Sequence, residues 1–384
     1  MMSLPSGCFR WPASWGSVMA GWCILVSGCV GTGKSVKSTV PGDAVRPGRA
    51  VGGRVAVVYS PSYEINLGGL ENLHSFDIHK YRRIYSALVK VGALVPREVF
   101  VTPTVTDEQV LRVHSRAFLD SLQSSANVGR YLEFPKLAKM PNRLADAAII
   151  SAFRRATGGT VNAAYLAVQH GIAINLAGGY HHAKPDAGEG FCIFNDIAIA
   201  IRELQAARVI RRACVVDLDV HQGNGTAVCF AGDDNVFTFS IHEGDIYPIP
   251  KEKSDLDVEL PAGTDDDAYL AALRRHLPIV LDAAKPELVV IQGGCDTLAG
   301  DPLARMRMTP GGIVRRDAMV IDECVRRRIP VVMTLGGGYG ADAWRAQYLS
   351  VARTLGVHGN RVSAERAASA AAGGKGGKAL DKGG

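Results

Sequence analysis

Six short apolar runs recur between residues 54 and 340, with stretches of helical periodicity such as 195–207 and 313–327 between them. They are RVAVVYS (54–60), IAINLAGG (172–179), ACVVDLDVH (213–221), NVFTFSIHE (235–243), ELVVIQGGCD (287–296) and PVVMTLGGGYG (330–340). Each run has the length of a strand and is nearly continuous in apolar residues, which is typical of strands buried on both faces. The pattern therefore predicts an α/β fold with a mostly parallel sheet between two layers of helices.

The 384 residues divide into segments of different composition. We expect one folded domain over residues 54–356, where the α/β pattern runs. Residues 29–53 contain two prolines and several glycines without periodicity, which predicts a flexible linker. Residues 357–384 are rich in alanine, glycine and lysine, and we interpret them as a disordered basic tail.

Composition argues against several classes of protein. No uninterrupted apolar run reaches the ~18–20 residues of a transmembrane helix. The formal net charge is +6, but no Lys/Arg cluster is interleaved with aromatic residues, so we expect no direct nucleic-acid binding. The eight cysteines show no CxxC pair and no regular spacing, so we expect no disulfide framework.

Polar side chains stand where the apolar runs end. His181 and His182 follow the second run, Asp217, Asp219 and His221 end the third, His242 closes the fourth, Asp296 the fifth, and Tyr339 follows the sixth. In open α/β sheets, ligands bind at the carboxyl ends of the strands. The sequence therefore predicts that these side chains form one site.

The string DLDVH supports a metal site. In an extended chain, residues two apart share a face, so Asp217, Asp219 and His221 would point together. Leaving three such polar groups unpaired on an apolar strand would be costly, and a divalent metal satisfies them. Asp296 completes an Asp₂His set with an open fourth position, which is typical of a catalytic zinc. Taken alone, Asp296 is better explained as a helix cap or turn residue.

Two further motifs carry groups that suit acid–base chemistry. The string GGYHHA places His181 and His182 after a glycine turn, and paired imidazoles can divide the proton transfers of a hydrolysis between them. The string GGGYG exposes Tyr339, whose hydroxyl could donate to a developing oxyanion. A half-buried structural tyrosine is the competing interpretation of Tyr339 alone.

Together these motifs resemble the zinc-dependent histone deacetylase family. The matching strings are GGYHHA, GEGFCIFNDIAIA, VVDLDVHQGNGT, QGGCDTLAGDPL, MTPGGIVRRD and GGGYG, with VVYSPSYEINLGGLENLHSFD and ATGGTVNAAYLAV nearer the N-terminus. The resemblance covers roughly residues 55–352 and is closest to the class IV branch and its bacterial relatives. It implies the three-layer arginase/deacetylase fold, with a central, mostly parallel sheet of about eight strands and helices on both faces.

The resemblance also implies a role for each site residue. One Zn²⁺ per chain would be bound by Asp219, His221 and Asp296. His181 and His182 match the catalytic histidine pair, with Asp217 orienting the first and Asn224 facing the second, and Tyr339 matches the transition-state tyrosine. Gly190, Phe191 and Gly337 match substrate-binding positions, Phe191 as an aromatic tunnel wall. Asp217, Asp219, His221, Ser240 and Ile241 match the place of a structural K⁺ ion.

The activity implied is that of a zinc-dependent amidohydrolase, which removes acetyl or longer fatty acyl groups from lysine side chains of proteins or peptides. An acetylpolyamine amidohydrolase, acting on acylated polyamines, is the nearest alternative. A ureohydrolase is more remote, because its two-metal site needs D-x-H-x-D and the last position here is Gly223. A non-catalytic acyl-lysine binder is also less favoured, because every catalytic position carries a competent residue.

The N-terminal string ILVSGCVGTGKS contains the phosphate-loop pattern G-x-x-x-x-G-K-[ST]. The prolines at 41 and 47 poorly suit the helix that such a loop needs. Residues 1–28 instead resemble a bacterial lipoprotein signal segment, with a short apolar core before Cys29. We therefore expect a lipid on Cys29 that attaches an exported envelope protein to the membrane. A cytoplasmic enzyme is the alternative if residues 1–28 are not a working signal.

Overall fold

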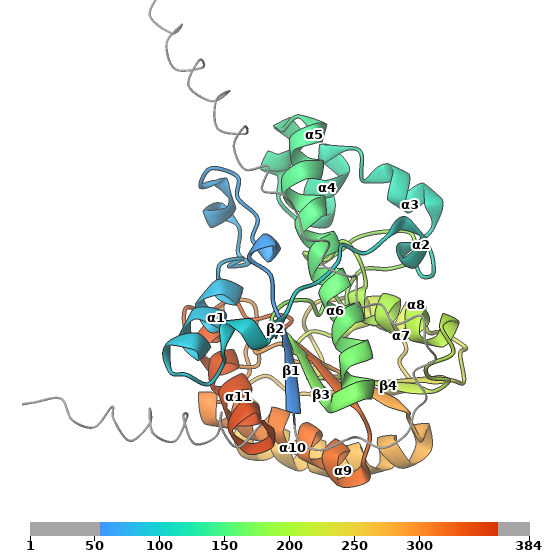
Figure 1. The fold of residues 1–384 in the computed structure, drawn as a ribbon, viewed down its shortest axis with the longest axis vertical. Helices are drawn as coiled ribbons and strands as arrows, with labels where there is room; N and C mark the ends of the chain where they lie inside the picture. The colour runs from blue at the N-terminus through green and yellow to red at the C-terminus, as the bar shows by residue number, and fades with distance from the viewer. Residues whose placement is uncertain (1–53, 360–384) are drawn as a thin grey trace, which may run out of the picture. The chain divides into compact units, whose positions relative to one another are not determined.

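The computed structural model describes residues 54–359, and its centre is an eight-stranded sheet in which neighbouring strands are parallel (Figure 1). The strands are β1 (Arg54–Val58), β2 (Val99–Phe100), β3 (Gly171–Asn175), β4 (Ala213–Asp217), β5 (Val236–Glu243), β6 (Leu256–Leu260), β7 (Leu288–Gln292) and β8 (Val331–Thr334). Their spatial order is β2-β1-β3-β8-β7-β4-β5-β6. The predicted parallel sheet is therefore confirmed.

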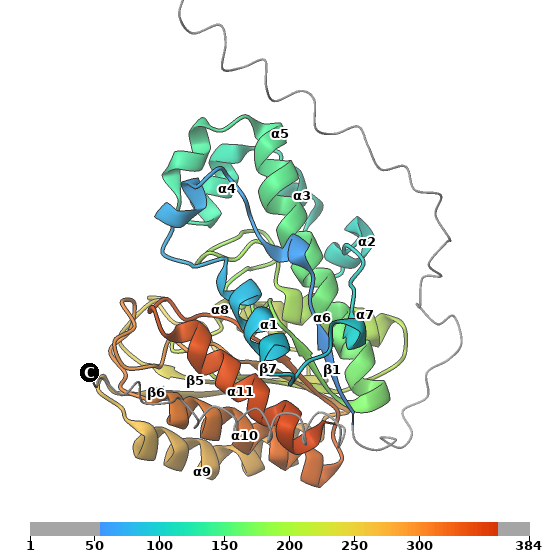
Figure 2. The same ribbon diagram turned by 60° about the vertical axis from the view of Figure 1, so that its left-hand side comes forward.

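Helices cover both faces of the sheet (Figure 2). One layer contains α6 (Ser151–His170), α7 (Asp196–Ala206) and α8 (Asn224–Cys229). The other contains α9 (Asp266–Ala284), α10 (Pro310–Arg327) and α11 (Ala343–His358), and α1 (Lys80–Lys90) packs against α11. The helical periodicity of residues 195–207 and 313–327 corresponds to α7 and α10.

Short helices between β2 and β3 form a helical lobe over residues 107–150 (Figure 1). They are α2 (Asp107–Val110), α3 (Arg116–Ser121), α4 (Ser125–Tyr131) and α5 (Asn142–Ala145), with a 3₁₀ turn at Pro135–Lys139 and a π-helical turn at Asp146–Ile150. Other 3₁₀ turns lie at Pro61–Tyr63, Leu70–Leu73 and Pro96–Glu98. The π-helical turn leads directly into α6, so the helical lobe is joined to the helix layer above the sheet.

The apolar runs predict the central strands and miss the two edge strands. Every residue of β4 and β7 is buried, which explains why these runs are continuously apolar. β2 has only two residues, and β6, with the sequence LDVEL, is partly exposed and carries two acidic side chains. An edge strand has one neighbour and is less covered, so it does not need a continuous apolar sequence.

The central strands all end at the same edge of the sheet, but β4 ends earlier than predicted. It stops at Asp217, so the expectation that Leu218–His221 continues the strand is wrong. The backbone N–H of Asp219 donates to Asp217 Oδ1 (3.2 Å), and that of His221 donates to Asp219 Oδ1 (3.1 Å). These side-chain acceptors replace strand partners and turn the chain into a loop.

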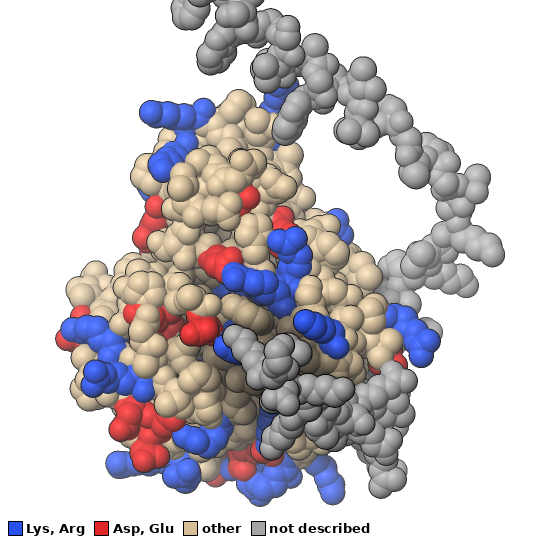
Figure 3. Space-filling view, turned by 90° about the vertical axis from the view of Figure 1, so that its left-hand side faces the viewer, with Lys and Arg blue, Asp and Glu red and all other residues tan. Residues whose placement is uncertain are grey.

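Charged side chains of both signs are intermixed on the face shown in Figure 3. None of the helices between residues 54 and 359 combines the length and apolar character that crossing a membrane requires. The predicted signal segment, the lipid on Cys29 and the linker lie outside the described residues. So does the tail beyond residue 359, although α11 continues to His358, two residues into the segment predicted as tail.

Candidate active site

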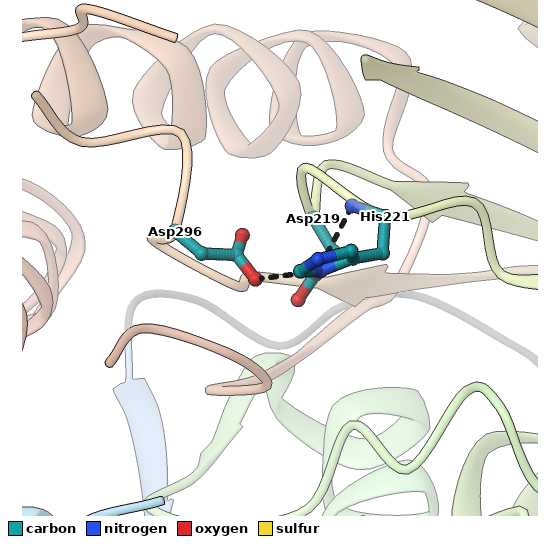
Figure 4. A group of neighbouring side chains, drawn as sticks. All are labelled: Asp219, His221 and Asp296. Carbon is teal, nitrogen blue, oxygen red and sulfur yellow. Dashed lines mark hydrogen bonds and ion pairs between the residues drawn. The ribbon is translucent and has the colours of Figure 1, made fainter. Parts of the chain in front are cut away.

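The predicted metal ligands come together beyond the ends of two neighbouring strands. Asp219 and His221 lie in the loop after β4, and Asp296 lies in the loop after β7. All three are buried, and their ligand atoms lie within 4.8 Å of one another. His221 Nδ1 is 3.1 Å from Asp219 Oδ1 and 3.2 Å from Asp296 Oδ2 (Figure 4).

The electrostatics of this group favour a bound cation. Burial and the nearby Asp219 carboxylate raise the pKa of Asp296 to about 7. Burial alone would lower the pKa of His221, but its hydrogen bonds to both carboxylates raise it to about 10. Both carboxylates therefore lie close to the same atom, Nδ1 of His221, where a positive charge would be stabilised. Two carboxylates and one imidazole fit a zinc ion held by three protein ligands.

Neighbouring groups fix the orientation of the two carboxylates. Gln292 Nε2 donates to Asp219 Oδ2 (2.8 Å), and the backbone N–H of Gly337 donates to the same oxygen (3.0 Å). The backbone N–H of Val220 donates to Asp296 Oδ1 (2.8 Å). The convergence thus depends on loop hydrogen bonds and on the pairing of β4 with β7, rather than on side-chain alternation along one strand.

Gly337 lies too close to the ligands to carry a side chain. An added Cβ would be 2.3 Å from Asp296 Oδ2 and 2.7 Å from Asp219 Oδ2. We expect Gly337→Ala to weaken zinc binding by about 10–100-fold, because the ligand carboxylates must move. Competition with a chromophoric chelator measures this affinity. Gly356→Ala is the control, since its added Cβ meets nothing within 4 Å; equal affinities for the two variants would contradict the prediction.

The two histidines differ in their partners. His181 Nδ1 is 2.7 Å from Asp217 Oδ2, whereas His182 Nδ1 is 2.7 Å from Asn224 Oδ1. Burial alone would lower the pKa of His181, but Asp217 and Asp219 raise it to about 9. Burial, His181 and His221 hold the pKa of His182 well below its usual range, and its amide partner offers no negative charge. His182 is therefore the histidine better suited to accept a proton and release it again.

Tyr339 lies in the loop after β8, with its backbone N–H donating to Asp301 Oδ2 (2.8 Å). Its ring faces Phe191, with 5.7 Å between the ring centroids. Burial and the charges of Asp219 and Asp296 hold the pKa of Tyr339 well above 10. The phenol therefore keeps its proton and can act as a hydrogen-bond donor.

Gly190 and Phe191 form a tight turn against His182. Both have positive φ angles, +55° at Gly190 and +65° at Phe191. A Cβ on Gly190 would lie 2.5 Å from His182 Cδ2, so only glycine fits at this position. A left-handed phenylalanine is strained, typically by about 1–3 kcal/mol, and such strain is common where a side chain is aimed into a site. The turn brings the Phe191 ring to the wall of the pocket.

A largely apolar pocket adjoins the histidine pair. Its catalytic side is lined by His181, His182, Gly190, Phe191, Gly337 and Tyr339. Its far side is lined by Leu132, Phe134, Leu137, Ile149 and Phe153, which come from the helical lobe and the start of α6. The same pocket is therefore lined both by the predicted catalytic side chains and by apolar residues of the helical lobe.

The residues matched to a K⁺ site lie on adjacent elements. Asp217 on β4 is in register with Ser240 on β5, and Ile241 follows Ser240. Ser240 Oγ is 2.9 Å from His242 Nδ1, and the Tyr269 hydroxyl donates to the Ile241 carbonyl (3.5 Å). The potassium ion stays a prediction.

Four residues that the sequence patterns did not single out also contact the site. They are Lys80, Glu189, Tyr247 and Gln292. Lys80 is buried, and its Nζ donates to the carbonyls of Gly336 (2.7 Å) and Gly337 (3.1 Å). In the sequence Lys80 lies in an ordinary amphipathic helix, so nothing in the local pattern distinguishes it from a surface lysine.

The acidic residues at the end of β5 and in the loop that follows it are paired with an arginine of the same chain. Glu243 Oε1 accepts a hydrogen bond from Arg305 Nε (2.6 Å), and Asp245 also pairs with Arg305. These carboxylates are neutralised within the chain. The same loop brings Tyr247 against His182, with 5.0 Å between the ring centroids.

Comparison with known proteins shows which family the chain resembles. Residues 74–355 match the histone deacetylase domain. The chain is 38% identical to histone deacetylase 2 of Arabidopsis thaliana over 289 residues, which cover 74% of this chain and 75% of that protein. It is 40% identical over 286 residues to an uncharacterised protein of Picosynechococcus, covering 74% and 91% of the two chains. Human histone deacetylase 1 is 29% identical over 283 residues, 69% of this chain and 57% of that protein.

The crystal structure of the HDA15 HD domain has a similar fold, with a TM-score of 0.65 and 22% identity, covering 83% of this chain and 94% of that chain. The parallel sheet and the buried Asp₂His group define an enzyme of the arginase/deacetylase superfamily. Within that superfamily the chain belongs to the histone deacetylase family, whose members are zinc-dependent hydrolases acting on amides.

Proposed function

We propose that the chain removes acyl groups, long fatty acyl groups in particular, from lysine side chains of proteins or peptides. The observation that carries this proposal is the apolar pocket that is lined both by the predicted catalytic side chains and by apolar residues of the helical lobe. An acetyl group would leave most of that lining without a contact, whereas a long acyl chain would bury it.

Asp219, His221 and Asp296 are the residues that would hold the zinc ion. Bound there, zinc would supply Lewis-acid polarisation of the amide carbonyl and acidify a water molecule. His182 takes up a proton at Nε2, because its Nδ1 is engaged with Asn224, and returns it to the leaving lysine amine. Asp217 keeps the His181 ring oriented beside it.

Tyr339 donates a hydrogen bond from its phenolic O–H to the oxyanion that forms during attack. The rings of Phe191 and Tyr339 contact each other and form part of the pocket wall. The apolar lining excludes water from the reacting carbonyl, which strengthens each of these polar interactions. The acyl chain then points toward Leu137 and Ile149, away from the lysine backbone.

A panel of peptides carrying acetyl-, octanoyl- and myristoyl-lysine tests the proposal. We expect kcat/KM to rise with chain length, by about tenfold or more from acetyl to myristoyl, because each buried methylene adds favourable transfer free energy. Acetylspermidine, assayed beside the peptides, tests the polyamine alternative. Highest activity on acetylspermidine, or on the acetyl peptide, would overturn the proposal.

Filling the pocket provides a matched test. Ile149 is buried and lines the far side of the pocket, so Ile149→Phe shortens the space for an acyl chain. We expect this variant to lose activity on myristoyl-lysine while activity on acetyl-lysine is retained. Because both substrates are hydrolysed by the same catalytic groups, the ratio of the two rates corrects for any partial misfolding. If the ratio of the myristoyl-lysine rate to the acetyl-lysine rate does not change, the acyl chain does not bind beside Ile149.

A further inference from the structure

The side-chain amide of Asn224 has a partner at each end. Its Oδ1 is 2.7 Å from His182 Nδ1, and its Nδ2 donates to Glu189 Oε1 (2.6 Å). Glu189 stands two residues before Phe191, on the short antiparallel bridge that joins Glu189 to Cys192. The Asn224 amide therefore links the Glu189 carboxylate to His182, the histidine proposed to exchange protons.

The same carboxylate also accepts a hydrogen bond from Tyr247, whose ring packs against His182. The Tyr247 hydroxyl donates to Glu189 Oε1 (2.9 Å), and the Tyr247 ring packs edge-on against His182, with 5.0 Å between centroids and an interplanar angle of 77°. Lys184 Nζ lies 3.4 Å from Glu189 Oε2 and 3.2 Å from Glu252 Oε1. Lys184 lies next to Oε2 of Glu189 and compensates its negative charge. The other oxygen, Oε1, accepts the hydrogen bonds from the Asn224 amide and the Tyr247 hydroxyl.

The contact decides which way the Asn224 amide faces. A carboxylate only accepts hydrogen bonds, so Asn224 must present its NH₂ group to Glu189 and its carbonyl oxygen to His182. The reversed amide would place two acceptors, its own oxygen and that of Glu189, in contact. With a carbonyl oxygen facing Nδ1, the neutral His182 ring must carry its hydrogen on Nδ1 and leave Nε2 free.

We propose that Glu189 is a positioning residue that fixes the Nδ1–H tautomer of His182 through Asn224. In the other tautomer Nε2 would carry the hydrogen and could not accept a proton from water. The proposal rests on the amide hydrolysis proposed above and holds for any acyl group. An aspartate at position 224 could only accept a hydrogen bond from Nδ1 and would fix this tautomer by itself. With asparagine at position 224, Glu189 is needed to hold the amide in the orientation that does the same.

A double-mutant cycle tests this assignment. We expect Glu189→Ala to lower kcat by about 10–100-fold with little change in KM, because part of the His182 population adopts the inactive tautomer. In the Asn224→Asp background the aspartate accepts from Nδ1 by itself, so Glu189→Ala should cost less than about threefold or restore activity by removing a like charge. Equal losses in both backgrounds would overturn the proposal.

Glu252→Ala is the matched control. Glu252 pairs with the same Lys184 but, unlike Glu189, its carboxylate is not the partner of Asn224 or Tyr247. We expect this variant to retain wild-type kcat. A loss comparable to that of Glu189→Ala would show that neutralising Lys184, rather than orienting the amide, is what matters.

The tautomer itself can be observed without turnover. In the zinc-loaded wild-type enzyme, ¹⁵N NMR of the histidine rings should show His182 protonated at Nδ1 and bare at Nε2. Glu189→Ala should shift the two ¹⁵N signals toward each other as the second tautomer appears, whereas the Glu252→Ala control should leave them unchanged. Identical His182 spectra for wild type and Glu189→Ala would overturn the proposal, even if none of the acylated peptides is hydrolysed.

Discussion

Replacing Tyr339 with phenylalanine is expected to lower kcat by about 10²–10³-fold while zinc stays bound, because one donor to the oxyanion is lost. The phenol keeps its proton, since burial and the carboxylates of Asp219 and Asp296 hold its pKa well above 10. It therefore donates a hydrogen bond at any working pH. Steady-state kinetics on an acyl-lysine peptide measures the loss, and metal analysis of the same sample measures zinc.

The loss should fall on kcat more than on KM, because the oxyanion exists only in the transition state. Tyr348→Phe serves as the control, since Tyr348 lies on α11 with its ring beside Trp344 and outside the pocket lining. If Tyr339→Phe hydrolyses the peptide as fast as the wild type, the role proposed for Tyr339 is wrong. Loss of zinc from the variant would show instead that the substitution disturbs the metal site.

The central strands could be predicted from the sequence because strands buried on both faces consist mainly of apolar residues. β4, β7 and β8 are apolar up to their last residue, whereas β5, with the sequence VFTFSIHE, alternates apolar and polar residues although nearly all of them are buried. β6 follows a different rule: at the sheet edge a strand such as LDVEL can alternate apolar and acidic residues. Strand prediction therefore succeeded where cover was complete and failed where it was partial.

The predicted side chains do come together, though one reason given for it was wrong. Asp219 and His221 lie in a loop, where hydrogen bonds from the backbone to carboxylates fix their directions. Lys80 and Glu189 were missed because their partners lie far away in the sequence, although Glu189 stands within the string GEGFCIFNDIAIA. Lys80 reaches Gly336 across 256 residues of sequence, and Glu189 reaches Asn224 across 35. Such contacts depend on packing between elements, which a residue pattern does not encode.

The acyl pocket was beyond prediction for a related reason. Its far side is built from a 3₁₀ turn, a π-helical turn and the helix that follows, represented by Leu137, Ile149 and Phe153. The 3₁₀ turn and the π-helical turn are too short to show a period in the sequence, although α6 itself has 20 residues. The position of these residues relative to the catalytic side chains depends on how the helical lobe packs against α6.

The Asp296→Asn substitution is expected to abolish zinc binding and lower activity by more than about 10³-fold, because the metal supplies several kcal/mol of transition-state stabilisation. Asparagine has nearly the same shape as aspartate but no charge, so the Asp₂His set loses one of its two anionic ligands. Metal analysis and steady-state kinetics measure the two effects on one sample. Asp267→Asn, on the exposed first turn of α9, is the matched control and should keep both properties.

The same substitution should not destabilise the metal-free protein. Burial and Asp219 raise the pKa of Asp296 from 3.8 to about 7, so the folded chain holds this proton more tightly than the unfolded chain does. The contribution of Asp296 to the stability of the metal-free wild type therefore falls as pH rises from about 4 through about 7, where its carboxyl must ionise inside the protein.

Because asparagine removes this ionisation, metal-free Asp296→Asn should melt at the wild-type temperature or above it at pH 8, and its melting temperature should change less between pH 5 and pH 8. Adding zinc should raise the melting temperature of the wild type only, since a ligand stabilises the state that binds it. Thermal melts of both proteins with and without zinc measure this. A metal-free variant that melts well below the metal-free wild type at pH 8 would mean that Asp296 holds the fold together, and the loss of activity could then not be assigned to the metal.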